Sequence, residues 1–431
     1  MTCALTQLCK DGRVPSALAV PTYRRLFTAQ AVSLAGTGLA TVALGLLAYD
    51  VAGSGGGLVL GTVFAIKMLA YVAVAPVAAA LVHTAPPRAV LVTADLVRVV
   101  VVLGLPLVSA VWQVYLLVLV LQAASAVHTP AYQAVLPRVL EDEPRYTQAL
   151  SLSRLAEDLE MVLSPLLAAA LLLVVPSSDL FVGTAIGFAV SALLVSRLGL
   201  GAAAGGVDGG GSGDVEGRAG GPTAFGRRVG RGTTLMVTTP ALRAVLALNM
   251  VVAAGGAYVL VQYVLVAREV YARGDGVAAL LMAGLGAGSI TVAVLLPRAL
   301  DALAERALML GGGGVLVIAT AGVAAALHVP GTGGLVLVGA LFALVGAGWA
   351  AAETPVGRII ARTTAERDQP AVFAAQFSLS HACWLVTYPL AGWLGVLGLG
   401  PAALVLAGLG AAALAATAAL WPAREVSHVA R

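Results

Sequence analysis

Charged side chains at the head of one apolar segment are the residues of this sequence best suited to chemistry. The segment, residues 151–165, reads SLSRLAEDLEMVLSP and holds Arg154, Glu157, Asp158 and Glu160. A helix turns by about 100° per residue, so Arg154 can reach Glu157 or Asp158 at i, i+3 or i, i+4. Three carboxylates against one guanidinium leave an excess of negative charge. An ionised carboxylate near the centre of a bilayer costs roughly 2.5 to 3.5 kcal/mol. If this segment crosses a membrane, we therefore expect a cation to balance the excess negative charge.

Two interpretations of this segment stay open. In the first, its charges lie close enough to the membrane surface to be wet, and they form a structural network with other arginines or a neighbouring helix. In the second, Glu157 and Asp158 face a cavity and alternate between a proton and a metal cation, as the coupling site of a proton antiporter. Arg154 is then their partner in coupling or gating, and Met161, one turn above Glu157, offers a thioether ligand.

Histidine offers a softer ligand, and His381 is the most informative of the five. A neutral imidazole suits Ni²⁺, Co²⁺ and Zn²⁺, whereas carboxylates alone favour harder cations. His381 ends the motif SLSH, which repeats SLSR at Arg154; the alternative is a packed histidine bonded to a backbone carbonyl. Gln376 lies off to the side of the same helix and completes the candidate set. His128 is expected near the cytoplasmic mouth of a cavity, as an entry ligand or as a gating histidine at a helix end.

Four more charged residues fall within or beside apolar stretches. Lys67 lies deep in VFAIKMLAY and can reach water only with difficulty. We expect it to meet Asp50 or Glu353 across the cavity, in a structural or a gating role. Asp50 ends its own stretch on the outer side, as an exit ligand or a helix-end carboxylate. Asp95 and Arg98 are spaced i, i+3 and are expected to neutralise each other as a structural pair.

The elements that position these residues are membrane helices. Hydrophobic residues make up 60% of the chain, charged residues only 11%, and the mean hydropathy is +0.96, outside the range of soluble domains. A helix needs roughly 20 apolar residues to cross a bilayer. The apolar runs are continuous, without the alternation of a β-barrel. We expect twelve spans near residues 26–49, 57–81, 89–109, 111–129, 151–175, 179–197, 240–264, 277–297, 305–327, 332–352, 371–396 and 401–421.

The positive charges of the connections predict the orientation. Lys and Arg are concentrated in the N-terminal arm, the even-numbered connections and the C-terminal tail, whereas the odd-numbered connections hold only Arg268 and Arg273. The positive-inside rule therefore places both termini in the cytoplasm of a multi-pass protein of the bacterial inner membrane. The net charge of +4 reflects this topology. The expected partner is the lipid bilayer, with no nucleic acid.

The chain divides into two halves. Residues 201–222 read GAAAGGVDGGGSGDVEGRAGGP and are expected to be flexible. We expect an N-terminal six-helix bundle at 1–200, a flexible cytoplasmic linker at 201–232 and a C-terminal six-helix bundle at 233–431. Weak echoes such as SLSR and SLSH recur in the same order in both halves, which favours two bundles of the same orientation, a parallel repeat found in secondary transporters.

Twelve spans, a central linker and a repeated six-helix unit together resemble the major facilitator superfamily over essentially the whole chain. The resemblance implies the fold of that family: an all-α membrane protein of two six-helix bundles. The family's loop between helices 2 and 3 has the pattern G-x-x-x-D-R-x-G-R-R, and this chain has AALVHTAPPR from Ala79 to Arg88. Only Arg88 is kept, and His83 stands where the family has Asp.

Longer segments resemble the nickel-resistance (NRE) exporters within that superfamily. They are RRLFTAQAVSLAGTGLATVALGLLAYDVAG, LGTVFAIKMLAYV, YTQALSLSRLAEDLE and FAAQFSLSHACWLVTYPLAGWLG. Some members of that group carry a His-rich tail, whereas this chain ends in REVSHVAR. The resemblance implies nickel as the substrate.

These features predict a transporter and no enzyme. No P-loop is present, and no Ser/His/Asp set stands out. We expect a monomeric, proton-coupled exporter of a divalent transition metal, Ni²⁺ or Co²⁺ being the cargo, with no cofactor. The first alternative is a drug or siderophore exporter, against which the aromatic content of 5% argues mildly. The second is a transporter-like membrane sensor that binds without moving its ligand.

Overall fold

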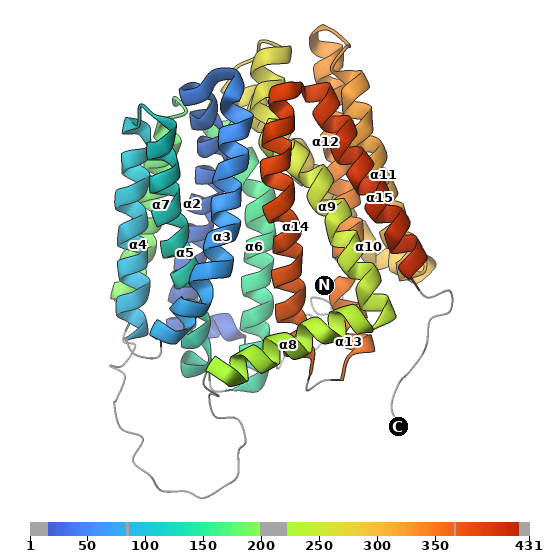
Figure 1. Cartoon of the computed structure of the whole chain (residues 1–431). Coiled ribbons are helices and arrows are strands. Elements are labelled where there is room, and N and C mark those ends of the chain that lie inside the picture. The colour runs from blue at the N-terminus through green and yellow to red at the C-terminus, as the bar shows by residue number, and fades with distance from the viewer. Residues whose placement is uncertain (1–15, 83–85, 141, 199–221, 366–367, 422–431) are drawn as a thin grey trace, which may run out of the picture.

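Helices make up nearly all of the described chain. The computed structural model describes residues 16–82, 86–140, 142–198, 222–365 and 368–421. The helices of the first half are η1 (Ala17–Ala19), α2 (Pro21–Ala52), η2 (Gly53–Gly55), α3 (Gly56–Val82), α4 (Pro87–Gly104), η3 (Leu105–Leu107), α5 (Val111–Val139), α6 (Glu143–Leu171) and α7 (Asp179–Ser196) (Figure 1). Those of the second half are α8 (Pro222–Thr238), α9 (Pro240–Leu265), the π-helical η4 (Val266–Val270), α10 (Asp275–Ala302), α11 (Glu305–Ala326), α12 (Gly331–Glu353), α13 (Val356–Thr363), α14 (Gln369–Leu397) and α15 (Leu399–Leu420).

Each of the twelve apolar stretches expected from the sequence coincides with one of the long helices. Among the described residues, nine stretches are long and apolar enough to cross a membrane, and the first of them covers both α2 and α3. α6 and α14 do not belong to these nine. They are the helices that carry residues 151–165 and His381, so the candidate chemistry lies on the two long helices least typical of a span. The expected all-helical class is confirmed.

The two ends of the helix bundle serve as landmarks. η2, η3 and η4 lie at one end, here called the η2 end, and α8 and α13 lie at the other, called the α8 end (Figure 1). Most consecutive long helices run in opposite directions between them. The α8 end is the end that the sequence predicts to be cytoplasmic.

Proline and glycine set several helix boundaries. Pro21, Pro87 and Pro240 occupy the first turn of α2, α4 and α9, where the missing N–H has no partner to lose. Gly398 separates α14 from α15 with φ 135°, a backbone conformation that favours glycine. Between such breaks the chain is continuously apolar and helical.

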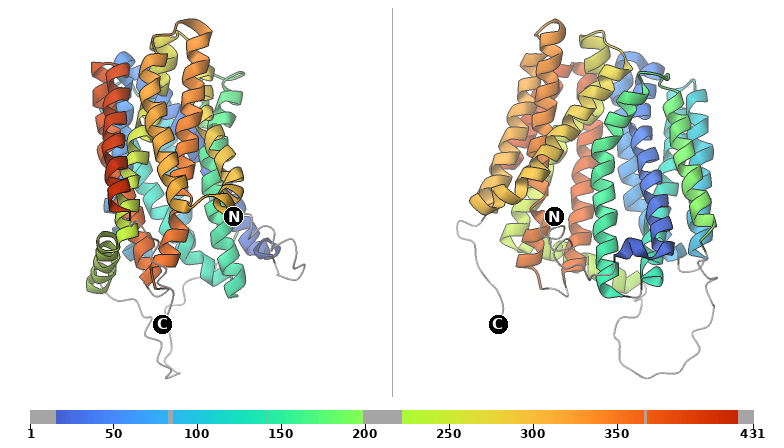
Figure 2. Two further views of the ribbon diagram at one scale, coloured as in Figure 1. Left: turned by 90° about the vertical axis from the view of Figure 1, so that its right-hand side faces the viewer. Right: turned by 180° about the vertical axis from the view of Figure 1, so that it is seen from behind.

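The helices of each half pack mainly on one another, and the halves meet along two seams. α2 packs on α7 and α3 on α5 in the first half, while α10 and α11 pack on α12 in the second. α3 lies against α14, and α6 lies against α10 (Figure 2). The α3–α14 contact is close because it is lined by glycine: a Cβ on Gly61 would lie 2.5 Å from the Tyr388 carbonyl oxygen, and one on Gly392 would lie 2.7 Å from that of Gly57.

Two features of the second half differ from the expected boundaries. Residues 222–232 were assigned to the linker, but they lie in the helix α8, and residues 199–221 lie outside the described part of the chain. The short helix α13 was not expected either. It has a strongly amphipathic sequence, VGRIIART, and eight residues are too few to cross a bilayer.

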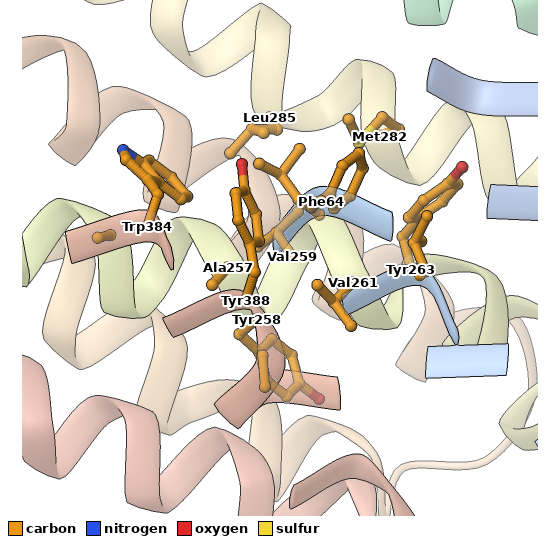
Figure 3. Packing of buried hydrophobic residues seen from close by; sticks show 14 of the residues in the cluster. Phe64, Ala257, Tyr258, Val259, Val261, Tyr263, Met282, Leu285, Trp384 and Tyr388 are labelled. Atoms are coloured by element: carbon orange, nitrogen blue, oxygen red, sulfur yellow. The ribbon is translucent and has the colours of Figure 1, made fainter. Parts of the chain in front are cut away.

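Aromatic side chains concentrate in the largest core cluster. Phe64 of α3, Tyr263 of α9, Met282 of α10 and Trp384 and Tyr388 of α14 belong to this one cluster (Figure 3). It therefore crosses from the first half of the chain to the second.

Candidate functional site

The seam between α3 and α14 brings together the residues that the sequence singled out on these two helices. The helices run antiparallel, and ring contacts join them at two levels: Phe64 to Tyr388, with centroids 4.9 Å apart, and Tyr71 to His381, 6.4 Å apart. Lys67 lies between Phe64 and Tyr71 on the same helix, at i+3 and i−4 from them. The seam thus holds aromatic rings, one half-buried ammonium and one imidazole.

A row of aromatic rings extends from this seam into the second half. Tyr388 lies 5.0 Å from Trp384, and Trp384 lies 5.0 Å from Trp349 of α12. Gly256 of α9 leaves room for the row, because a Cβ there would overlap the ring of Trp384. We call Phe64, Tyr388, Trp384 and Trp349 the aromatic row. It is built from three helices, α3, α14 and α12.

A carboxylate closes the Trp349 end of the aromatic row. The indole Nε1–H of Trp349 donates to Glu353 Oε2 at 2.5 Å, one helical turn along α12. Glu353 is half-buried. Flat π-faces next to an acidic group are chemically suited to a planar or cationic organic molecule.

His381 is bonded within its own helix. Its Nδ1 lies 2.7 Å from the Phe377 carbonyl oxygen, and the two rings lie 3.9 Å apart. A carbonyl oxygen only accepts, so Nδ1 carries the hydrogen and Nε2 is the basic nitrogen. This is the backbone-bonded arrangement that the sequence left open as the alternative to a metal ligand.

Gln376 is engaged by another amide. Its Nε2 donates to Asn249 Oδ1 at 2.9 Å, and Asn249 Nδ2 donates back to Gln376 Oε1 at 3.2 Å. The pair ties α14 to α9. An amide whose oxygen already accepts in this pair is a poor additional metal ligand.

Each of the two partners expected for Lys67 has a contact of its own. Asp50 lies at the η2 end, where its Oδ1 is 3.7 Å from Arg268 Nη2, and Glu353 accepts from Trp349. Lys67 stands eleven residues into α3, which is roughly 16 Å along the helix from that end. The structure therefore does not bring Lys67 and Asp50 together.

The acidic segment on α6 is described only in part. Arg154, Glu157, Asp158 and Met161 lie on α6, but their side chains fall outside the described part of the structure. Glu160 is half-buried, and its Oε1 lies against α2: a Cβ on Gly38 would be 2.7 Å from it. The proposed roles of Glu157 and Asp158 stay predictions.

Asp95 and Arg98 form the ion pair that their spacing predicts, and His128 joins them. The pair is buried on α4, and His128 of α5 places Nε2 3.7 Å from Asp95 Oδ1. His128 is itself buried, with 9% exposed. The sequence placed it at a cytoplasmic mouth, but its neighbours are the two charged residues of α4.

Polar contacts link the two halves at the η2 end. Tyr49 of α2 donates its hydroxyl hydrogen to Glu269 Oε1 at 2.5 Å, and Tyr263 of α9 donates to the Val42 carbonyl oxygen at 3.1 Å. Arg268 is the centre of this group, because it pairs with both Asp50 and Asp275. We call Tyr49, Asp50, Arg268, Glu269 and Asp275 the η2-end clasp.

Replacing Arg268 by glutamine is expected to loosen the clasp. A partly exposed pair contributes about 1 kcal/mol or less, so the equilibrium between closed and open halves shifts by up to roughly five-fold. Spin labels at Ser54 and Val270, in a background without native cysteines, measure the separation by pulsed electron resonance. Longer distances are expected for Arg268→Gln and unchanged distances for Arg273→Gln, whose side chain contacts Thr332 within the second half. Equal behaviour of both variants contradicts a clasp role.

An apolar groove lies beside the clasp. It has a volume of about 720 Å³ and is formed by the ends of α6 and α10, with Leu166, Leu173, Val277 and Leu280 among its walls and Asp275 at its edge. Its lining is chiefly apolar. It lies on the α6–α10 seam and is lined by none of the residues of the aromatic row.

The described residues do not gather metal ligands. Among them, no group of three or more His, Cys, Asp or Glu side chains could hold a metal ion. His381, Gln376 and His128 have the separate neighbours given above. A transition-metal substrate is therefore not supported by the described side chains.

Two packed helical halves, nine candidate spans among the residues that the structure describes and a seam rich in functional groups are the features of a membrane transporter. The chain belongs to the Major Facilitator Superfamily, whose sequence profile matches residues 26–384. This confirms the family and the fold that the sequence resembles, and members of this superfamily are transporters, not enzymes. The nickel-resistance group is not confirmed. A comparison with curated proteins finds no match.

Solved structures share the fold with low sequence identity. The nucleoside transporter NupG matches with a TM-score of 0.71 and 11% identity, over 93% of this chain and 100% of that chain. A bacterial homologue of the human lysosomal transporter Spinster, facing inward, matches with 0.64 and 14%, over 93% and 97%. A bacterial metal transporter matches with 0.63 and 12%, over 93% and 98%. Identities this low support the fold alone and select no substrate.

Sequence reasoning missed the aromatic row. Aromatic residues are only 5% of the chain, and this low content by itself argues mildly against a drug-sized organic substrate. An aromatic content averaged over 431 residues does not show where the aromatic residues gather. Trp349 of α12 meets Trp384 and Tyr388 of α14 only in the folded protein. The signal available in the sequence was the spacing of Trp384 and Tyr388, one helical turn apart.

Proposed function

We propose that this protein is a secondary transporter of a small planar organic solute with a positive charge, which it binds at the aromatic row. The supporting observation is the continuous contact from Phe64 through Tyr388 and Trp384 to Trp349, ending on Glu353. The drug exporter was the first alternative from the sequence. The arrangement of the rings now favours it over the metal exporter.

The chemistry of the row fits such a solute. A cation over the face of Trp or Tyr gains about 0.5 to 2 kcal/mol, and ring stacking adds about 0.5 to 1.5 kcal/mol for each pair. Glu353 supplies the counter-charge.

The position of the row supports transport by alternating access. The row joins α3 of the first half to α12 and α14 of the second, so rocking of the halves changes its exposure. The clasp closes the η2 end. With the α8 end in the cytoplasm, as the charge distribution predicts, a state closed at the η2 end would exchange its solute with the cytoplasm, as an exporter does when it is loaded.

Proton coupling and metal transport stay predictions from the sequence. Glu157 and Asp158 remain candidate proton-coupling groups on α6. A metal cargo has the support of a structural neighbour, the bacterial metal transporter, but this shows the fold alone. An assay that offers both kinds of cargo separates the two hypotheses.

Flux measurements on proteoliposomes test the proposal. The purified chain is reconstituted, and a pH gradient is imposed in the presence of ethidium, a planar organic cation, or Ni²⁺. We expect ethidium movement above that of protein-free liposomes and no added Ni²⁺ movement. Ni²⁺ flux without ethidium flux contradicts the proposal and supports the hypothesis of a metal exporter. Saturable ethidium binding without movement supports the sensor instead.

A further inference from the structure

A buried charged group lies within the first half, away from the aromatic row. Asp95 and Arg98 of α4 form an ion pair in which Asp95 is 0% and Arg98 is 3% exposed. Asp95 lies midway along α4. Ionised groups at such a depth are costly and are retained where they have a task or a full set of partners.

Groups from three neighbouring helices face the pair. His128 of α5 lies 3.7 Å from Asp95 Oδ1, and Ser191 of α7 lies beside the same carboxylate. The ring of Phe188, also on α7, is 4.3 Å from Arg98 Cζ, which gives the guanidinium a second favourable contact. Tyr71 of α3 is the next titratable group near Arg98. The group is thus enclosed by α3, α5 and α7.

Two nitrogen atoms beside the ion pair lack a hydrogen-bond partner. Arg98 Nε and His128 Nε2 are buried and unpartnered in the described part of the structure, whereas Ser191 Oγ is close enough to the Asp95 carboxylate to bond to it. More than nine in ten buried polar atoms of native proteins have a partner, and a buried atom without one costs about 1 to 3 kcal/mol. His128 Nε2 faces Asp95 Oδ1 and is therefore placed to share a proton with it.

We propose that Asp95 Oδ1 and His128 Nε2 together bind one proton that drives transport. A proton taken from water protonates the carboxylate, and the new O–H donates to the neutral imidazole at Nε2. Arg98 stays charged and stays over the ring of Phe188. When Asp95 is deprotonated again, the proton returns to water. Proton binding by this group does not depend on the proposed transport function; only its coupling to transport does.

The composition of the group excludes larger occupants. Among the described side chains, a metal cation would find one carboxylate and one imidazole beside a fixed guanidinium, which repels it. An anion would meet Asp95. A proton is small enough to lie between Oδ1 and Nε2 and adds one positive charge that two acceptors share.

The distance between Asp95 and His128 links proton binding to the packing of α4 on α5. The separation of 3.7 Å between Nε2 and Oδ1 exceeds a hydrogen bond, for which about 2.6 to 3.0 Å is needed. A shift of roughly 1 Å, by rotation of the two side chains or by approach of α4 and α5, closes this distance when the proton binds. α5 also packs on α3, which carries Phe64 of the aromatic row. The proton can in this way bias the seam without touching the solute.

Histidine resonances test proton binding without any solute. The chain contains five histidines, and loss of one ¹³Cε1 signal in His128→Phe assigns His128. We expect this signal to shift between pH 8 and pH 5 in the wild type and to stay constant in Asp95→Asn, because the ring senses the carboxyl proton. A His128 signal that ignores pH, or that shifts equally in Asp95→Asn, overturns the proposal.

Flux measurements test the coupling separately. His128→Phe leaves the Asp95–Arg98 pair intact, so it guards against a folding defect in Asp95→Asn. We expect at least a ten-fold loss of transport driven by a pH gradient in both variants, with solute exchange at equal pH unchanged. Unchanged gradient-driven transport overturns the coupling role. Failure of every organic cation to move, with the His128 shift intact, contradicts the proposed cargo and leaves the proton site standing.

Discussion

Replacing Trp384 by alanine is expected to weaken binding of a planar organic cation roughly 30-fold. Trp384 is the centre of the aromatic row, with Trp349 on one side and Tyr388 on the other, each 5.0 Å away. Loss of two ring contacts and of one face for the cation removes about 2 kcal/mol, and each 1.4 kcal/mol is a factor of ten in affinity. Binding of ethidium to the purified protein, followed by its fluorescence, measures the change.

The same helix supplies a matched control for this prediction. Trp393 lies nine residues further along α14 and is 56% exposed, whereas Trp384 is 7% exposed. Trp393→Ala therefore removes an equal side chain from the surface and should leave binding unchanged. Trp384→Phe keeps one ring and should recover part of the affinity. Equal losses in Trp384→Ala and Trp393→Ala would exclude the aromatic row as the binding site.

Replacing Glu353 by glutamine is expected to abolish the preference for charged solutes. The substitution keeps the size of the side chain and an oxygen that accepts from Trp349 Nε1, but it removes the negative charge. Two unit charges about 4 Å apart attract by roughly 4 kcal/mol at an effective dielectric constant of about 20, so loss of part of this attraction should lower the affinity for ethidium by roughly ten-fold or more. Binding of phenanthridine, the neutral ring system of ethidium, should change little. Competition assays with both compounds measure the two affinities.

A conservative change at the other end of the molecule is the control for Glu353→Gln. Asp179 is an exposed acidic residue in the first turn of α7, and Asp179→Asn removes one negative charge far from the row. It should alter neither affinity. If Glu353→Gln weakens ethidium and phenanthridine equally, the side chain supports the fold of the site and does not recognise charge.

Cargo binding and proton binding are proposed for different parts of the molecule. The row lies at the seam and is the proposed contact for the cargo, while Asp95 and His128 lie inside the first half and are the proposed acceptors of the proton. α3 is the physical link, because it carries Phe64 at the seam and packs on α5, the helix of His128. A proton that changes the packing of α5 can therefore change the exposure of the row.

The sequence predicted the class of fold and the positions of its long helices. Uninterrupted apolar runs of about 20 residues have one stable form in lipid, a helix that satisfies its own backbone. That local rule placed α2 and α9 within a few residues of their bounds. It also predicted the pairing of Asp95 with Arg98, because residues three apart on a helix are neighbours in any tertiary context.

The sequence did not predict the amphipathic helix α8 in full or the short helix α13. Residues 222–232 follow a glycine-rich run and were read with it as linker, although α8 packs on α14. The eight residues of α13 are too few for a span and gave no hydropathy signal. Helices of this kind are stabilised by the surface on which they lie, and that surface is formed by other parts of the chain.

Which side chains meet was decided by tertiary structure alone. Phe64 and Tyr388 are more than 300 positions apart, and His128 meets Asp95 across two different helices. In an all-apolar helix nearly every face is hydrophobic, so periodicity carries little information about which face turns inward. Glycines allow the close contacts between particular helices. Gly61 and Gly392 let α3 and α14 pack against each other, and Gly256 leaves space for the ring of Trp384. Composition determines that this chain folds as membrane helices, but the close approach of particular helices determines what it can bind.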